Sequence, residues 1–269
     1  MRKYSLAEIR QRTAEPLDAW WTVLLADPIA VRIVRLAAPR GWLPPYRLTG
    51  LAGLLGVAAA GCFAGQSRGW LIGGALLFHL AFVADCAART TARLTGTGSP
   101  FGVWCAFLAA RLRVILCAVA LMGRQYPRTG QARYLWLVAL VVGLDLLRYL
   151  NAGQVARLRG RLPAGDTGRG GAVRLRVKSW LRARRVRSHL VSGVEFEMAV
   201  FVAGPVTGWI TGTALLAGAL LAAFELRLIW HLRQSARPAA RATGRAVVLS
   251  HLASGRYGAA TAPGSNALG

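Results

Sequence analysis

The chain has 269 residues, of which 55% are hydrophobic and only 16% are charged, and its mean hydropathy is +0.41. This apolar content excludes an intrinsically disordered chain, and the scarcity of charges excludes an ordinary basic nucleic-acid-binding protein. The charges are nevertheless lopsided, because 34 Lys and Arg stand against 10 Asp and Glu, for a net charge of +24. A chain that is both basic and very apolar is typical of a multi-pass membrane protein.

We predict that residues 1–47 form a cytoplasmic leader before the apolar segments. Asp27 is suited to cap a helix and Pro28 suits its first turn. The following residues, Ile29–Leu36, alternate apolar side chains with two arginines, a pattern that suits a helix lying on an anionic membrane surface. We therefore predict an N-terminal amphipathic interfacial helix, with packing of the same helix on cytosolic loops as the alternative.

Six apolar segments follow, each close to the length of about 20 residues that a membrane-spanning helix needs. They are Leu48–Ala64, Trp70–Ala88, Val103–Met122, Tyr134–Leu150, Val191–Trp209 and Ile210–Trp230. The sequence therefore predicts an all-α integral membrane fold with six transmembrane helices, and it places the membrane domain at residues 48–232.

Positive residues are distributed unevenly between the two sides of these predicted spans. Of the Lys and Arg, 26 lie in the leader, the turn after the second span, the loop 151–190 and the tail, against four in the opposite turns. Because cytoplasmic loops carry such an excess, we predict a multi-pass protein of the cell membrane with both termini cytoplasmic. The basic loop is expected to attract anionic membrane lipids. Residues 233–269, rich in Ala, Gly, Ser and Arg, are predicted to be disordered.

One segment carries a recognisable motif. Residues 82–111 read FVADCAARTTARLTGTGSPFGVWCAFLAAR, which resembles the signature D-x2-D-G-x2-A-R-x8-G-x3-D-x3-D of the CDP-alcohol phosphotransferase family. Asp85 falls on the first Asp of that motif, while Ala92, Arg93 and Gly102 fall on its Ala-Arg pair and its later Gly. The resemblance implies six spans with cytoplasmic termini, a dimer, and a two-metal site that acts on a CDP-linked donor.

The carboxylates of the motif are mostly missing. Ala88, Ala106 and Ala110 stand at its second, third and fourth Asp positions. In the resembled family four carboxylates hold two divalent ions, and Mg²⁺ requires an octahedral set of oxygen ligands. Asp85 alone cannot organise two such ions. We therefore expect no metal cofactor, with Mg²⁺ or Mn²⁺ needed only if the chain is an active transferase.

Three arginines are candidates for binding phosphate, namely Arg89, Arg93 and Arg111. A guanidinium binds phosphate through two parallel hydrogen bonds, so these residues could hold a phosphate-bearing ligand without cleaving it. The alternative for Arg89, which replaces the motif Gly, is an ion pair with Asp85 four residues earlier on the same helical face. We favour the ion pair.

Acidic residues elsewhere in the predicted spans are poor replacements for the lost metal ligands. Asp145 and Glu225 each have an arginine two or three residues later, and we expect them to form local ion pairs. Glu195 and Glu197 lie two residues apart, so a regular helix directs them to different faces.

Three functions agree with these features. The favoured one is a non-catalytic or altered relative that binds a lipid or phosphate ligand, or that pairs with an intact family member, as a homodimer or heterodimer. The alternatives are an active transferase that moves a phosphatidyl or phosphoalcohol group from a CDP-linked donor to an alcohol in phospholipid synthesis, and a cavity repurposed for other lipid or isoprenoid chemistry. The expected partners are membrane lipids and a CDP-linked lipid or lipid phosphate, without nucleic acid.

Overall fold

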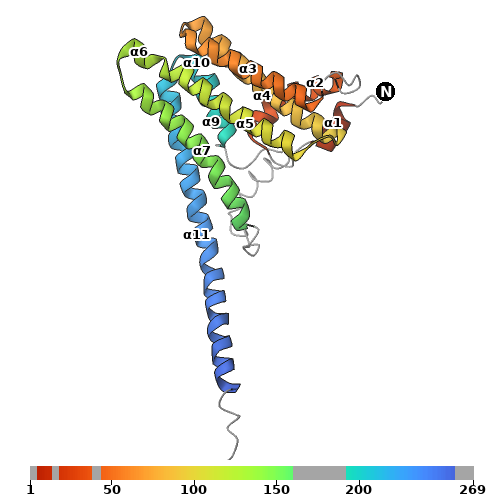
Figure 1. Cartoon of the computed structure of the whole chain (residues 1–269), viewed down its shortest axis with the longest axis vertical. Coiled ribbons are helices and arrows are strands. Elements are labelled where there is room, and N and C mark those ends of the chain that lie inside the picture. Colours follow the sequence, from red (N-terminus) through yellow and green to blue (C-terminus); the bar gives the residue numbers. More distant parts are fainter. Residues whose placement is uncertain (1–4, 14–17, 38–43, 160–191, 258–269) are drawn as a thin grey trace, which may run out of the picture. The chain divides into compact units, whose positions relative to one another are not determined.

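The computed structural model describes residues 5–13, 18–37, 44–159 and 192–257, and all of the elements in these ranges are helical (Figure 1). The α-helices are α1 (Leu6–Thr13), α2 (Asp27–Ala37), α3 (Pro45–Gly65), α4 (Arg68–Thr95), α5 (Pro100–Ala118), α6 (Gln125–Thr129), α7 (Arg133–Arg159), α9 (Gly193–Met198), α10 (Gly204–Thr207) and α11 (Ile210–Tyr257). Three wider, π-type helical turns complete the set: η1 (Thr22–Ala26), η3 (Val119–Gly123) and η4 (Ala199–Ala203).

Five helical segments in the described ranges are long and apolar enough to cross a membrane. They are Pro45–Gly65, Arg68–Thr95, Pro100–Thr129, Arg133–Val155 and Ile210–Gln234. These segments correspond to the first four and the last of the spans expected from the sequence, so a helical membrane protein with several candidate spans is confirmed.

The remaining predicted span, Val191–Trp209, has a different form in the structure. It consists of three short consecutive elements, α9, η4 and α10, which together run from Gly193 to Thr207. This run is shorter than the roughly 20 residues that a straight crossing needs. It ends at Gly208, whose positive φ of 80° stops the helix. The segment is nevertheless largely buried among its neighbours.

Two prolines explain two of the wider turns. A proline inside a helix lacks an N–H and its ring clashes with the carbonyl four residues earlier, a clash that a wider turn relieves. The carbonyl four residues before Pro28 lies in η1, and the carbonyl four residues before Pro205 lies in η4. This geometry corrects the expectation that Asp27 caps a helix, because Asp27 has helical dihedrals and continues the helix from η1 into α2.

The chain divides into two compact units, one made of Met1–Leu150 with Arg169–Phe224 and the other of Asn151–Gly168 with Glu225–Gly269. In the second unit Asn151 donates a hydrogen bond to Glu225, so Glu225 has this partner in place of the local arginine expected from the sequence. The backbone of α11 is helical to Tyr257, and the disorder expected from residue 233 stays a prediction. Residues 160–191, which hold most of the basic loop, and residues 258–269 lie outside the described ranges.

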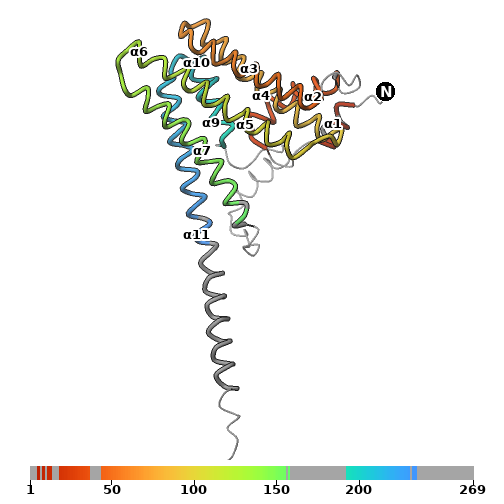
Figure 2. The backbone as a smooth tube through the Cα atoms, viewed as in Figure 1, coloured from red at the N-terminus to blue at the C-terminus, as the bar shows by residue number. Residues whose placement is uncertain are grey.

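The first unit is built around α3, which packs against both α4 and α5 (Figure 2). Small residues let these helices approach closely, as a Cβ added to Gly74 of α4 would lie 2.6 Å from the Phe63 ring of α3. The aromatic centre of this core is the stack of Phe78 on Phe201, with ring centroids 4.7 Å apart. The unit thus packs α4 at its centre, against both α3 and the α9–α10 run.

The described part of the leader packs on α4. Ala30 and Val34 of α2 are fully buried, whereas Arg32 and Arg35 are exposed, so α2 has one buried and one exposed face. A second anchor precedes α2, because the Trp21 indole N–H donates to Nδ1 of His79 over 3.4 Å. The packing of α2 against α4 accounts for its buried face, and the position of this helix at the membrane surface stays a prediction.

Candidate functional site

The motif residues lie where α4 ends and α5 begins. Gly96 terminates α4 in the left-handed conformation, with φ of 66°. Ser99 then caps α5, because its hydroxyl accepts a hydrogen bond from the Gly102 amide over 3.0 Å. A Cβ at position 102 would lie 3.1 Å from that hydroxyl oxygen, so the motif glycine keeps this cap compact. The short turn brings the two halves of the motif onto neighbouring helices.

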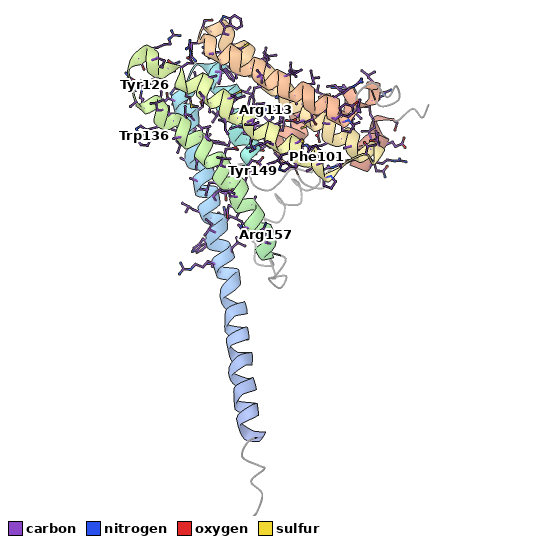
Figure 3. All side chains as sticks on the ribbon, in the orientation of Figure 1. Phe101, Arg113, Tyr126, Trp136, Tyr149 and Arg157 are labelled. Atoms are coloured by element: carbon purple, nitrogen blue, oxygen red, sulfur yellow. The ribbon has the colours of Figure 1, made fainter. Side chains whose placement is uncertain are left out.

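Asp85, the one motif carboxylate, forms an ion pair across this helix pair. Its Oδ2 lies 2.7 Å from Nη1 of Arg113 on α5. Figure 3 labels Arg113. Both side chains are shielded, with 15% of Asp85 and 4% of Arg113 exposed. The expected pair between Asp85 and Arg89 is therefore wrong, because the Asp85 carboxylate contacts Arg113 while the Arg89 guanidinium donates to the Cys86 sulfur over 3.2 Å.

Two further residues shape the site around Arg113. Gly56 of α3 faces the arginine stem so closely that an added Cβ would lie 2.8 Å from both Cγ and Cδ of Arg113. The Phe78 ring of α4 lies beneath the guanidinium, with 5.4 Å between Cζ and the ring centroid. Gly56 thus leaves room for the aliphatic stem of Arg113, and the Phe78 ring lies against its flat face. The Asp85 carboxylate pairs with its charge.

The other carboxylate positions of the motif add no oxygen ligands. Ala88 is buried, and Ala106 and Ala110 are half-buried on α5. Within the described ranges there is no group of three or more His, Cys, Asp or Glu side chains able to hold a metal ion. The residues present do not fit the two-metal centre of the resembled family, since the one carboxylate at this place already contacts a guanidinium.

The three candidate phosphate-binding arginines occupy two different environments. Arg89 and Arg93 are exposed, one turn apart, near the end of α4. Arg93 also donates to the backbone oxygen of Thr13 over 3.1 Å, which ties the end of α1 to α4. Arg111 is instead buried within α5 and occupied by carboxylates, so the structure removes it from the phosphate-binding candidates.

Arg111 is the centre of a second buried cluster, which joins α5, α7 and α9. Its Nη1 contacts Asp145, and its Nη2 contacts Oε1 of Glu197 at 2.9 Å. Nη2 also donates to the Tyr149 hydroxyl over 3.1 Å, while Cζ lies 3.9 Å from the centroid of the Tyr149 ring. Arg148, the local partner expected for Asp145, lies over the same ring at 4.5 Å.

The two glutamates of α9 have separate roles, as their spacing predicts. Glu197 faces Arg111, whereas Glu195 faces the leader and the start of its own helix. The Glu195 carboxylate accepts hydrogen bonds from the Trp20 amide at 3.0 Å and from the Ser192 amide at 2.9 Å. This arrangement is a capping box that also fastens the leader.

The sequence interpretation missed Arg113 as a site residue and paired Asp145 with the wrong arginine. The available signal was the placement of Arg111 and Arg113 in the middle of an apolar span. An arginine in a spanning helix requires an acidic partner, and few acids are present in the other spans.

No model of a known protein family matches this chain, and no curated protein matches it at a significant level. The link to the CDP-alcohol phosphotransferase family therefore stays a resemblance carried by the motif residues.

Proposed function

We propose that this chain is a non-catalytic relative of the CDP-alcohol phosphotransferases that binds a phosphate-bearing lipid. In this proposal it crosses the cell membrane six times, with the whole predicted span 191–209, which extends beyond both ends of the α9–α10 run, as the fifth crossing and both termini in the cytoplasm. The α2 helix lies at the cytoplasmic surface, where its exposed arginines meet anionic headgroups.

The observation that carries the proposal is the ion pair between Asp85 and Arg113. A two-metal transferase needs several free carboxylate oxygens to hold its ions, and a carboxylate free to take the proton of the attacking alcohol. Here one carboxylate is present at the motif and a permanently charged guanidinium contacts it. The site therefore lacks both the ligands and the base that the transfer reaction requires.

Ligand binding is assigned to the exposed arginines of α4. Arg89 and Arg93 lie one turn apart on the same helix, so their guanidinium groups can contact one phosphate together. Lipid phosphate and the diphosphate of a CDP-linked lipid share this chemistry. Pairing with an intact family member, as a homodimer or heterodimer partner, would place such a ligand next to a competent site.

The test of catalysis uses the purified full-length protein in detergent with Mg²⁺ or Mn²⁺ and CDP-diacylglycerol. We expect no release of CMP above the level of the Asp85→Asn variant. Metal-dependent CMP release that disappears in Asp85→Asn would contradict the proposal and support an active transferase. A product formed from a lipid diphosphate without any nucleotide would instead support a repurposed cavity.

The test of ligand binding uses vesicles of phosphatidylcholine with or without phosphatidic acid. We expect that an Arg89→Gln and Arg93→Gln double variant loses about tenfold in its preference for phosphatidic acid, which is about 1.4 kcal/mol. The double variant Arg124→Gln and Arg128→Gln is the matched control, because both are exposed arginines far from the motif in sequence and it removes the same number of charges. An equal loss in both variants would show a general charge effect and contradict the assignment.

A further inference from the structure

Asp85 has a specific counter-charge within the chain, in addition to the missing carboxylates around it. The three alanines of the motif explain why metal ligands are few, but they do not explain what neutralises Asp85 inside an apolar helix bundle. An isolated carboxylate is costly to bury in such surroundings. The structure supplies the cation from within the chain, as Arg113 contacts Asp85 at 2.7 Å.

The position of Arg113 relates directly to the lost ligands. Ala106, Ala110 and Arg113 are separated by four and three residues, so they lie along one face of α5. This is the face that carries the third and fourth carboxylates in the motif of the resembled family. Arg113 therefore projects its charge from the same face, one turn beyond the second of those alanines.

Two residues pack closely around the side chain of Arg113. The missing Cβ of Gly56 leaves the space that the stem fills, since a Cβ there would lie 2.8 Å from Cγ and Cδ. The Phe78 ring lies 5.4 Å from the guanidinium carbon. A cation entering from solution would have to displace a buried side chain that three residues hold in place.

We infer that Arg113 is a built-in cation that takes the place of a divalent metal ion at Asp85. This inference takes the location of the lost metal ligands from the proposed function. The ion pair between Asp85 and Arg113 does not depend on that function. Its consequence is that restoring the carboxylates alone does not restore metal binding. The guanidinium has to be removed as well, because a fixed positive charge beside Asp85 repels a divalent ion.

The decisive experiment measures Mn²⁺ binding to full-length protein in detergent by electron paramagnetic resonance. One variant restores the motif through Ala88→Asp, Arg89→Gly, Ala106→Asp and Ala110→Asp, and a second variant adds Arg113→Met. We expect the second variant to bind Mn²⁺ at least tenfold more tightly than the first. Equally tight binding by both would overturn the inference and leave the proposed function intact.

If both variants are monodisperse and neither binds Mn²⁺, the family-type scaffold is refuted, and the proposed function fails together with the inference. A second measurement needs no restored carboxylates, so it applies even where those variants do not fold. It compares the melting temperatures of Asp85→Asn, Arg113→Met and the double variant of the natural chain. We expect the double variant to melt above Arg113→Met, and a melting temperature below both single variants would overturn the inference.

Discussion

Arg111 and Arg113 lie two residues apart on α5, and the comparison between them shows how this bundle holds charge. Arg113 faces α3 and α4, where it contacts one carboxylate, that of Asp85. Arg111 faces α7 and α9, where it contacts the two carboxylates of Asp145 and Glu197. Residues two apart on a helix point to different sides, so one helix supplies the counter-charge for acids on three others.

The two arginines differ in the number of buried carboxylates that lose their counter-charge when the arginine is removed. Breaking a buried ion pair by deleting one partner costs about 3–5 kcal/mol, mainly because the other charge is left buried without compensation. Arg111 would leave two buried acids and Arg113 would leave one, which is also partly exposed. The following predictions use this difference, from the largest expected effect to the smallest.

Arg111→Met should be the most destabilising single change in this helix. It leaves Asp145 and Glu197 uncompensated, so we expect a loss of about 5 kcal/mol in the free energy of unfolding. The measurement is reversible unfolding in mixed detergent micelles. Leu112→Met is the control, because Leu112 is 49% exposed and should change stability by about 0.5 kcal/mol or less. Equal losses in Arg111→Met and Leu112→Met would contradict the role of the cluster.

Arg113→Met should cost about 3 kcal/mol, less than Arg111→Met, because it leaves one acid with 15% exposure. Adding Asp85→Asn removes the uncompensated charge and should recover at least half of that loss. The same unfolding measurement checks both values. A larger loss of unfolding free energy in Arg113→Met than in Arg111→Met would contradict this comparison.

Gly56→Ala tests the space that receives the arginine stem. The new Cβ would lie 2.8 Å from two carbons of Arg113, so we expect a loss of about 1–3 kcal/mol from overpacking. Gly53→Ala is a matched control on the same helix, since no atom lies within 4 Å of a Cβ there. The control should be neutral or stabilising by up to about 1 kcal/mol, because Ala favours helix over Gly. Similar losses at both positions would contradict close packing around Arg113.

Glu195→Gln should have the smallest effect, about 1 kcal/mol. Glu195 accepts hydrogen bonds from the Trp20 and Ser192 amides and does not contact either arginine of α5. A glutamine keeps one acceptor oxygen and loses the other. Limited proteolysis should show faster cleavage within the leader of this variant. A loss as large as that of Arg111→Met would place Glu195 within the charge cluster.

Several features of the fold could be predicted from the sequence because they depend on local composition. The apolar run Leu48–Ala64 gave a helix close to the expected limits, whereas the helix of Trp70–Ala88 continues to Thr95, since about 20 apolar residues specify a spanning helix but not where it ends. The α9–α10 run was harder to predict. Its hydropathy resembles that of a full span, but its wider turn before Pro205 and its glycine stop at Gly208 depend on backbone geometry.

The motif itself shows where sequence reasoning reaches its limit. The identity and spacing of Asp85, Ala88, Ala106 and Ala110 are readable directly, and they predict that oxygen ligands are missing. The separate faces of Glu195 and Glu197 also follow from helical periodicity, and the structure confirms them. The partner of Asp85 was predicted wrongly, because a spacing of four residues makes Arg89 a neighbour without determining which way either side chain points.

By itself the sequence determined the helical, apolar character of this protein and the loss of three acidic residues from the motif. The tertiary structure decided which charges meet. Asp85 pairs with Arg113 across 28 positions of sequence because helix packing buries both side chains, while Arg89 remains exposed to solvent. In an environment of low dielectric constant a shielded partner stabilises a charge far more than an exposed one, and only the packing of the helices fixes which residues are shielded.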